Sequence, residues 1–137
     1  MTKHTGGCLC GAIRYEITGD PVRAAHCHCD ECRKATGASF ATVVFFKEED
    51  VKLVQGTPKQ FFHQADSGNT MTKEFCGDCG SQVLGGGSGS PGIRSVRVGS
   101  LDDASFVKPQ MELYTGKALP FSRLSDDIER FEEGRSR

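Results

Sequence analysis

The sequence predicts an all-β fold in which antiparallel strands form a single domain over residues 1–137. Three observations lead to this prediction. Short segments alternate apolar and polar residues, which is the period of a half-buried strand. Gly, Asn, Asp and Pro residues separate these segments at short intervals, as turns do. The chain of 137 residues is also thin in aliphatic side chains but contains seven cysteines, which suggests that bound metal supplements a small core.

The expected elements follow the chain in order. Ile13, Tyr15 and Ile17 alternate with polar residues, so the first expected strand covers 12–18. Further strands are expected at 22–26, 40–46, 51–54, 59–63, 70–75 and 94–98. The other expected elements are a helical turn at the end of the cysteine-rich segment 27–34, a tight turn at 76–81, a flexible glycine-rich loop at 85–92, a helical turn at 102–108, and a terminal helix at 126–133 that Ser125 caps and Gly134 ends.

Charge and hydropathy exclude several classes of protein. With 17 basic and 18 acidic side chains and no basic tract, we expect no nucleic-acid partner. No segment approaches the roughly 18 apolar residues of a membrane span, and the N-terminal residues lack a signal-peptide pattern. A cytoplasmic protein with reduced thiols is expected. An odd number of cysteines cannot complete a set of disulfides, so metal binding or thiol chemistry is favoured.

Four of the cysteines have the spacing of a closed metal site. Cys76 and Cys79, followed by Gly80, are typical of a zinc knuckle, and Cys8 and Cys10 supply a second pair of ligands. Together they predict a structural zinc site of four sulfurs. Iron would also accept this ligand set. A redox dithiol is the alternative for Cys-x-x-Cys, but the usual α/β pattern around such a motif is missing.

The remaining cysteines, Cys27, Cys29 and Cys32, are one ligand short of a closed site. A zinc ion with three protein ligands and an open fourth position is the arrangement of a catalytic centre. Either His26 or His28 could instead supply the fourth ligand and make a second structural site. Strand alternation directs His28 away from the side of Cys27 and Cys29, which favours a supporting role.

Several other polar residues are candidates for substrate contact. Arg33 and Lys34 follow the three cysteines directly and could hold a carboxylate-bearing substrate, whereas Lys73 and Arg123 could equally be solvated surface charges. The remaining candidates are Asp30 and Glu31 as general bases and His63 as a residue near the site.

With these motifs in place, nearly the whole chain resembles the glutathione-dependent formaldehyde-activating enzyme family, also called the centromere protein V domain. The resemblance rests on four ordered motifs: Gly7-Cys8-Leu9-Cys10-Gly11 leading into Ile13-Arg14-Tyr15, His26-Cys27-His28-Cys29 through Cys32-Arg33-Lys34 and Gly37, Phe75-Cys76 through Cys79-Gly80-Ser81, and Gly99-Ser100-Leu101-Asp102-Asp103.

The resemblance implies a β-tent, or Mss4-like, fold with two zinc ions per chain. It assigns Cys8, Cys10, Cys76 and Cys79 to the structural zinc, and Cys27, Cys29 and Cys32 to the catalytic zinc. The implied activity is that of a carbon–sulfur lyase, which joins glutathione to formaldehyde and gives S-hydroxymethylglutathione. Its partners would be a small thiol such as glutathione and a small aldehyde. A non-catalytic, zinc-stabilised binding module is the rival reading, since relatives include proteins associated with chromatin or microtubules.

Overall fold

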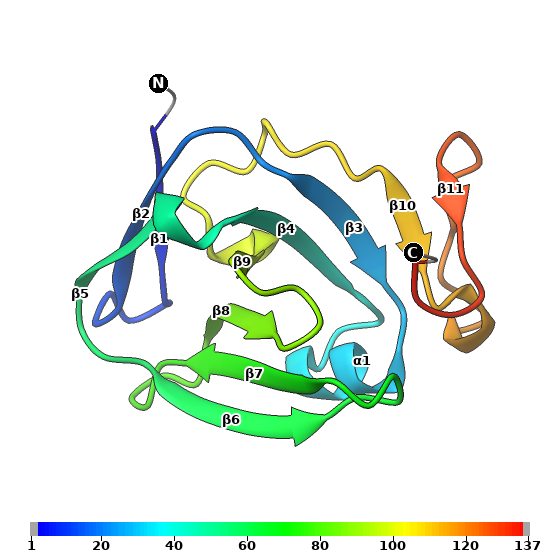
Figure 1. Cartoon of the computed structure of the whole chain (residues 1–137), viewed down its shortest axis with the longest axis horizontal. Helices are drawn as coiled ribbons and strands as arrows, with labels where there is room; N and C mark the ends of the chain where they lie inside the picture. Colours follow the sequence, from blue (N-terminus) through cyan, green and yellow to red (C-terminus); the bar gives the residue numbers. More distant parts are fainter. Residues whose placement is uncertain (1–2, 136–137) are drawn as a thin grey trace.

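The computed structural model describes residues 3–135 and is built mainly from short strands (Figure 1). In chain order its elements are β1 Lys3–Gly7, β2 Arg14–Thr18, β3 Arg23–Cys27, α1 Asp30–Thr36, β4 Ala41–Lys47, β5 Val51–Gln55, β6 Lys59–Gln64, β7 Thr70–Phe75, β8 Gln82–Gly87, β9 Ile93–Arg97, β10 Met111–Leu113 and β11 Glu129–Arg130, with single 3-10 turns at Glu48–Asp50, Val98–Ser100 and Thr115–Lys117.

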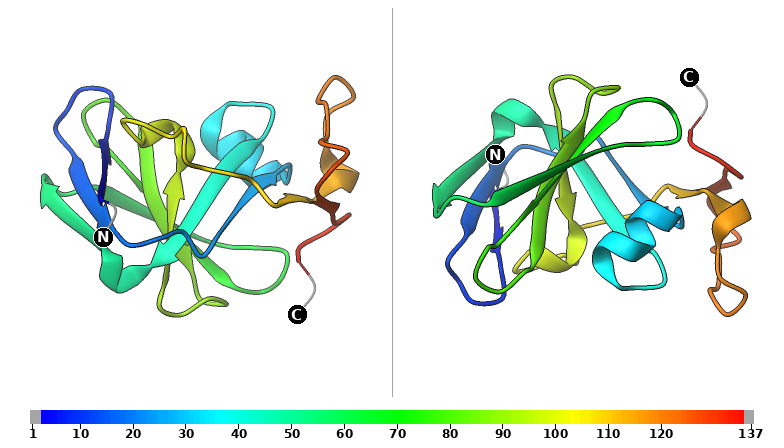
Figure 2. Two further views of the ribbon diagram at one scale, coloured as in Figure 1. Left: turned by 90° about the horizontal axis from the view of Figure 1, so that it is seen from above. Right: turned by 90° about the horizontal axis from the view of Figure 1, so that it is seen from below.

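The strands form two sheets. The smaller sheet has the order β1-β2-β5, and the larger one has the order β11-β10-β3-β4-β9-β8-β7-β6. All pairs are antiparallel except that β10 runs parallel to both β3 and β11, so the expectation of purely antiparallel pairing is wrong at this end. Figures 1 and 2 show the small sheet on the side of the molecule away from β10 and β11, and in Figure 1 α1 lies below the end of β3. The all-β class is confirmed.

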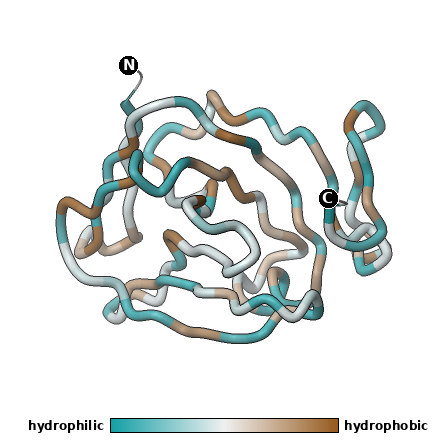
Figure 3. The backbone as a smooth tube through the Cα atoms, viewed as in Figure 1, coloured by the Kyte–Doolittle hydropathy of each residue, from teal (hydrophilic) through white to brown (hydrophobic). Residues whose placement is uncertain are grey.

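A compact core joins the two sheets. Tyr15 and Ile17 of β2 are fully buried against Val44 and Phe46 of β4 and against Val83, Leu84 and Val96 of β8 and β9. Figure 3 shows short hydrophobic and hydrophilic stretches that follow one another along the chain. Gly6 of β1 lies so close to Tyr15 that an added Cβ would be 2.3 Å from the phenol oxygen, which explains glycine in this strand.

The terminal helix expected at 126–133 does not form. The segment instead contributes β11, and the Ser125 N–H donates to the Glu112 carboxylate at 3.0 Å rather than opening a helix. A helix of eight residues has little stability of its own. The buried acceptor on β10 and the parallel pairing of Met111 with Glu129 therefore decide the local structure.

Two further local expectations are also wrong. β8 continues through Gly87, so only the second part of the glycine-rich segment 85–92 is a loop. Within the described segment 102–108 there is no helix; Asp102 instead accepts hydrogen bonds from Thr5 and Arg14 and fastens this segment to the small sheet. The polar strand β1 and the short β10 are additions that periodicity did not predict.

Within residues 3–135, no helix has the length and apolar character needed to cross a membrane.

Candidate metal centres and the cavity beside them

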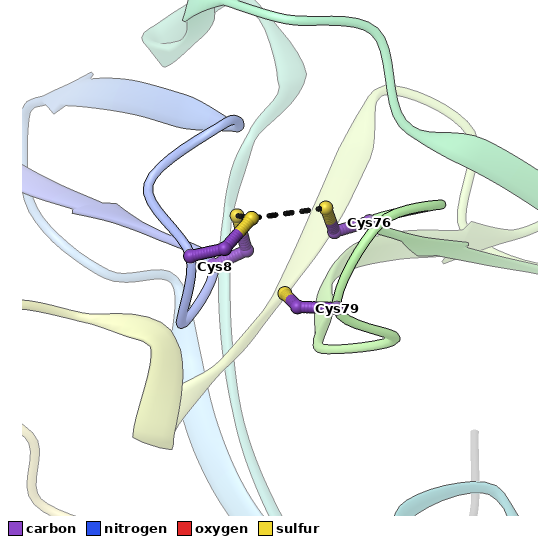
Figure 4. Close-up of side chains that lie close together, drawn as sticks. Cys8, Cys76 and Cys79 are labelled. Atoms are coloured by element: carbon purple, nitrogen blue, oxygen red, sulfur yellow. Dashed lines mark hydrogen bonds between the residues drawn. The ribbon is translucent and has the colours of Figure 1, made fainter.

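Two hairpin turns from different sheets bring together the four cysteines of the expected structural site. Cys8 and Cys10 lie in the connection from β1 to β2, and Cys76 and Cys79 in the connection from β7 to β8. All four Sγ atoms lie within 4.8 Å of one another, with Cys8 to Cys10 at 3.6 Å and Cys10 to Cys76 at 3.7 Å. Figure 4 shows Cys8 facing Cys76 and Cys79 across the gap between the two loops.

Backbone amides fix the direction of these sulfurs. The Ile13 N–H donates to Cys8 Sγ at 3.2 Å, and the Asp78 N–H donates to Cys76 Sγ at 3.4 Å. Gly80 has φ +78°, which lets its N–H return to the Cys76 carbonyl and close the knuckle. Hydrogen bonds from the Ser81 side chain and backbone lower the pKa of Cys79 to about 5, which favours the thiolate that binds metal.

The sulfur separations fit a tetrahedral zinc ion. Zn–S bonds of about 2.3 Å require sulfurs about 3.8 Å apart, whereas a disulfide requires about 2.05 Å. The observed separations of 3.6 and 3.7 Å agree with the metal and exclude the disulfide. The set of four thiols could therefore hold one metal ion and link the small sheet to the large one.

The second group is built where β3 meets α1. Cys27 ends the strand, Cys29 is the N-cap of the helix, and Cys32 lies in its first turn. Cys29 Sγ accepts the Cys32 N–H at 3.2 Å and lies 3.4 Å from Cys27 Sγ. Among residues 3–135, no His, Asp or Glu ligand atom joins these three sulfurs, so a metal held here would keep a coordination position open.

His28 supports this loop from behind. Its side chain is fully buried, and Nε2 lies 2.7 Å from Glu112 Oε1 on β10. Glu112 also accepts the Ser125 N–H, while the His28 N–H donates to the Leu113 carbonyl. His28 is thus a supporting residue, as alternation along the strand predicts, and it fastens the ligand loop to the C-terminal segment.

Glu112→Ala is expected to lower the free energy of unfolding by about 3–5 kcal/mol, because it leaves His28 buried without its partner. Urea unfolding followed by circular dichroism measures this change. Glu129→Ala is the matched control, since Glu129 lies exposed on the neighbouring β11 and should change stability by less than about 0.5 kcal/mol. Equal effects of the two substitutions would contradict the role of the His28–Glu112 pair.

The three-cysteine group opens onto a cavity of about 460 Å³ between β3, β4, β7, β8 and β9. Gly85, Gly86 and Gly87 of β8 form part of its wall. A Cβ on Gly85 would lie 2.6 Å from the Thr72 carbonyl oxygen and 2.9 Å from Ser95 Oγ. The glycines therefore allow close strand packing and leave space that side chains would otherwise fill.

A second cavity, of about 750 Å³, lies beside Arg14 and Asp102, which neutralise one another.

The charged lining of the smaller cavity is mainly basic. Lys73 of β7 and Arg97 of β9 line it near the sulfurs, and Arg23 lines it at the start of β3, with its guanidinium 4.6 Å from the centre of the Phe45 ring. The pKa of Cys32 is lowered, first by hydrogen bonds from Cys27 and Cys29 and then by the Arg97 guanidinium. Glu31 is the acidic residue of this lining.

The residues expected to hold substrate lie elsewhere. Arg33 pairs with Asp30 at 3.1 Å, Lys34 is exposed, and neither lines the cavity. Arg123 is exposed as well. The basic residues that line the cavity near the three cysteines are instead Lys73 and Arg97. Sequence reasoning missed Arg97 because the pairing of β9 with β4 and β8 decides which face of the large sheet Arg97 lies on, and the sequence pattern of one strand does not contain this pairing.

Tyr114 forms part of the cavity wall in an unusual backbone conformation. Its φ of 56° and ψ of 45° lie in the left-handed region, which non-glycine residues rarely adopt. The Tyr114 N–H donates to the Glu133 carbonyl, and the Lys117 N–H donates to the Tyr114 carbonyl. These bonds hold the strained residue and the chain end beside the three-cysteine group.

Comparison with known proteins agrees with the fold and the cysteine pattern. The family model described as glutathione-dependent formaldehyde-activating enzyme matches residues 3–117. The chain therefore belongs to that family. It is also similar to the crystal structure of a Rhodobacter sphaeroides protein, with a TM-score of 0.56 and 26% sequence identity over 77% of this chain and 91% of that chain.

Proposed function

We propose that the protein is a zinc-dependent carbon–sulfur lyase, which joins glutathione or a related thiol to formaldehyde or another small carbonyl at the three-cysteine centre. One observation carries this proposal: among the residues that the structure describes, no fourth protein ligand joins Cys27, Cys29 and Cys32, and these three line a cavity with basic residues in its wall. Zinc bound there would supply a positive charge that favours the thiolate form of a substrate thiol. The four-cysteine group would hold the second, structural zinc.

The basic lining suits an anionic thiol. Glutathione carries two carboxylates and one ammonium group, and Arg97 and Arg23 outnumber Glu31 in the cavity. Arg23 precedes Cys27 by four residues on an extended strand, so their Cα atoms are roughly 13 Å apart. A carboxylate at the far end of the thiol can therefore reach Arg23 while its sulfur lies beside the cysteines.

In the reaction, the thiol sulfur forms a bond to the carbonyl carbon, and the carbonyl π electrons move to oxygen. The thiol proton is transferred to that oxygen, so the product contains every atom of both reactants. Lys73 and Arg97 provide the positive charge that stabilises the oxygen as it becomes negative. Ala25, Val43 and Met111 line the cavity and limit access of water to the reacting atoms.

With glutathione, the protein is expected to speed equilibration with formaldehyde above the uncatalysed rate, and with 2-mercaptoethanol much less so. Arg23→Gln should raise KM for glutathione about 10- to 100-fold, since it removes a charge-assisted hydrogen bond worth roughly 1.5–3 kcal/mol. Exchange spectroscopy with ¹³C-formaldehyde measures these rates. The KM for 2-mercaptoethanol, which has no carboxylate, should not change.

A rate equal to background with every thiol tested would contradict the enzyme and favour the binding-module reading. Loss of activity with both thiols in Arg23→Gln would show instead that Arg23 maintains the cavity rather than a carboxylate contact. Metal content measured on the same samples separates either result from loss of zinc.

A further inference from the structure

A chain of three polar side chains crosses from α1 to β7 at the edge of the cavity. Lys73 Nζ lies 2.6 Å from His63 Nε2, and His63 Nδ1 lies 2.9 Å from a Glu31 carboxylate oxygen. The three residues come from different elements: Glu31 from α1, His63 from β6 and Lys73 from β7. Lys73 and Glu31 both line the cavity, whereas His63 lies between them.

The chemistry of these groups fixes the direction of the hydrogen bonds. A carboxylate only accepts, so His63 Nδ1 donates to Glu31. In the neutral imidazole, Nε2 then accepts from the Lys73 amino group. The tautomer of His63 thus holds Lys73 Nζ in one position and leaves its other hydrogens or its lone pair for the cavity.

The position of Lys73 is unusual for a lysine. The residue is 8% exposed, although lysines are rarely buried without a carboxylate partner, and the partner here is a neutral ring. Across the strand pair it faces Gly85, which offers no side chain to cover it. Burial, and then the charge of Arg97, lower its pKa, while Cys32, Glu31 and Cys29 act in the opposite direction.

These features distinguish Lys73 from a lysine that only neutralises a negative cluster. Arg97 already lies beside Cys32 and lowers the pKa of that thiol. A second cation beside it would be repelled by Arg97, and this repulsion favours the neutral amine of Lys73. An amine that is held at a cavity wall and can gain and lose a proton suits proton transfer.

We propose that Lys73 is a catalytic residue that carries the thiol proton to the aldehyde oxygen, and that His63 and Glu31 are positioning residues for it. The inference rests on the carbon–sulfur lyase proposed above. The neutral amine of Lys73 takes the proton as the thiol becomes a thiolate. The sulfur bonds to the carbonyl carbon, the π electrons move to oxygen, and the Lys73 ammonium returns the proton to that oxygen. Lys73 is then neutral again, and the reverse order breaks the product down.

Lys73→Met is the principal test, because methionine keeps the unbranched chain and removes the amine. We expect kcat to fall about 10²- to 10⁴-fold, the range that a positioned acid or base contributes. The metal content and the Kd of glutathione, measured by calorimetry without aldehyde, should stay within about threefold of the unaltered protein. Lys52→Met is the matched control, since Lys52 is exposed on β5 away from the cavity.

His63→Gln tests the positioning role, because glutamine can still accept from Lys73 but cannot transmit the contact to Glu31. We expect a fall in kcat smaller than that of Lys73→Met and no change in KM. The double variant should be no slower than Lys73→Met alone, since His63 acts through Lys73. Independent, multiplying losses would overturn the positioning role.

The outcomes separate this inference from the function on which it rests. If the unaltered protein shows no rate above background, the lyase proposal fails and the role of Lys73 falls with it. If the unaltered protein is active and Lys73→Met keeps kcat within threefold, only the proton-transfer role is overturned. If Lys73→Met loses metal or glutathione binding together with activity, Lys73 is a structural or binding residue and the inference is wrong.

Discussion

Cys76→Ser is expected to unfold the protein at room temperature. Cys76 is 1% exposed and belongs to the group that joins the β1–β2 turn to the β7–β8 turn. A structural zinc site supplies about 10–16 kcal/mol, which equals or exceeds the about 5–15 kcal/mol by which a typical domain is stable. Here the core is small, so loss of one ligand should remove most of the net stability. Far-ultraviolet circular dichroism and metal analysis measure the result.

Removal of metal from the unaltered protein by a strong chelator should have the same effect, and addition of zinc should restore the fold. The outcome that counts against a structural role is a Cys76→Ser protein that keeps a cooperative thermal transition within a few degrees of the original. In that case the contacts of the buried core alone would hold the two sheets together.

Cys29→Ser is expected to abolish catalysis and release one metal ion while the fold remains. Serine is a good helix N-cap, so its hydroxyl can replace the sulfur that now accepts the Cys32 N–H. The loop also keeps the buried pair of His28 and Glu112 behind it. With two sulfurs left, the centre should no longer hold its metal, and we expect the rate to fall to background, a loss of at least about 10³-fold.

The measurements are the ¹³C-formaldehyde exchange rate, the metal content and the dispersion of the amide spectrum. The two cysteine variants act as controls for each other, because each removes one sulfur from a chain with seven cysteines. Unfolding of Cys29→Ser would show that its group is structural too. Activity that survives both Cys29→Ser and chelation would favour thiol redox chemistry over the lyase.

The difference between these two variants follows from the places of the two groups in the fold. The four-cysteine group brings together turns that belong to separate sheets, so its loss is expected to separate them. The three-cysteine group lies within one local segment, from the end of β3 to the first turn of α1, and holds no distant element. Its three sulfurs instead line a cavity, which supports the catalytic role proposed for them.

The sequence alone predicts the all-β class, seven of the strands and both cysteine groups. Alternation along one strand and cysteine spacing in one tight turn are local properties, so residues such as Tyr15 or Cys76 and Cys79 can be interpreted without knowledge of the rest of the chain. The pairing of the two halves of the four-cysteine group could also be predicted, because two pairs complete a tetrahedral site. The structure confirms that their sulfurs are close together.

Only the tertiary structure decides which charged residues surround the three-cysteine group. Arg33 is adjacent to Cys32 in sequence, yet the helix directs it to Asp30; Arg97 is 65 residues away in sequence and reaches that thiol. The same holds for residues 126–133, where a helix is expected. The Ser125 N–H donates to the buried Glu112 carboxylate, and the segment that follows forms β11 instead. Strand order and register set these contacts, and both depend on pairings between distant segments that no local pattern contains.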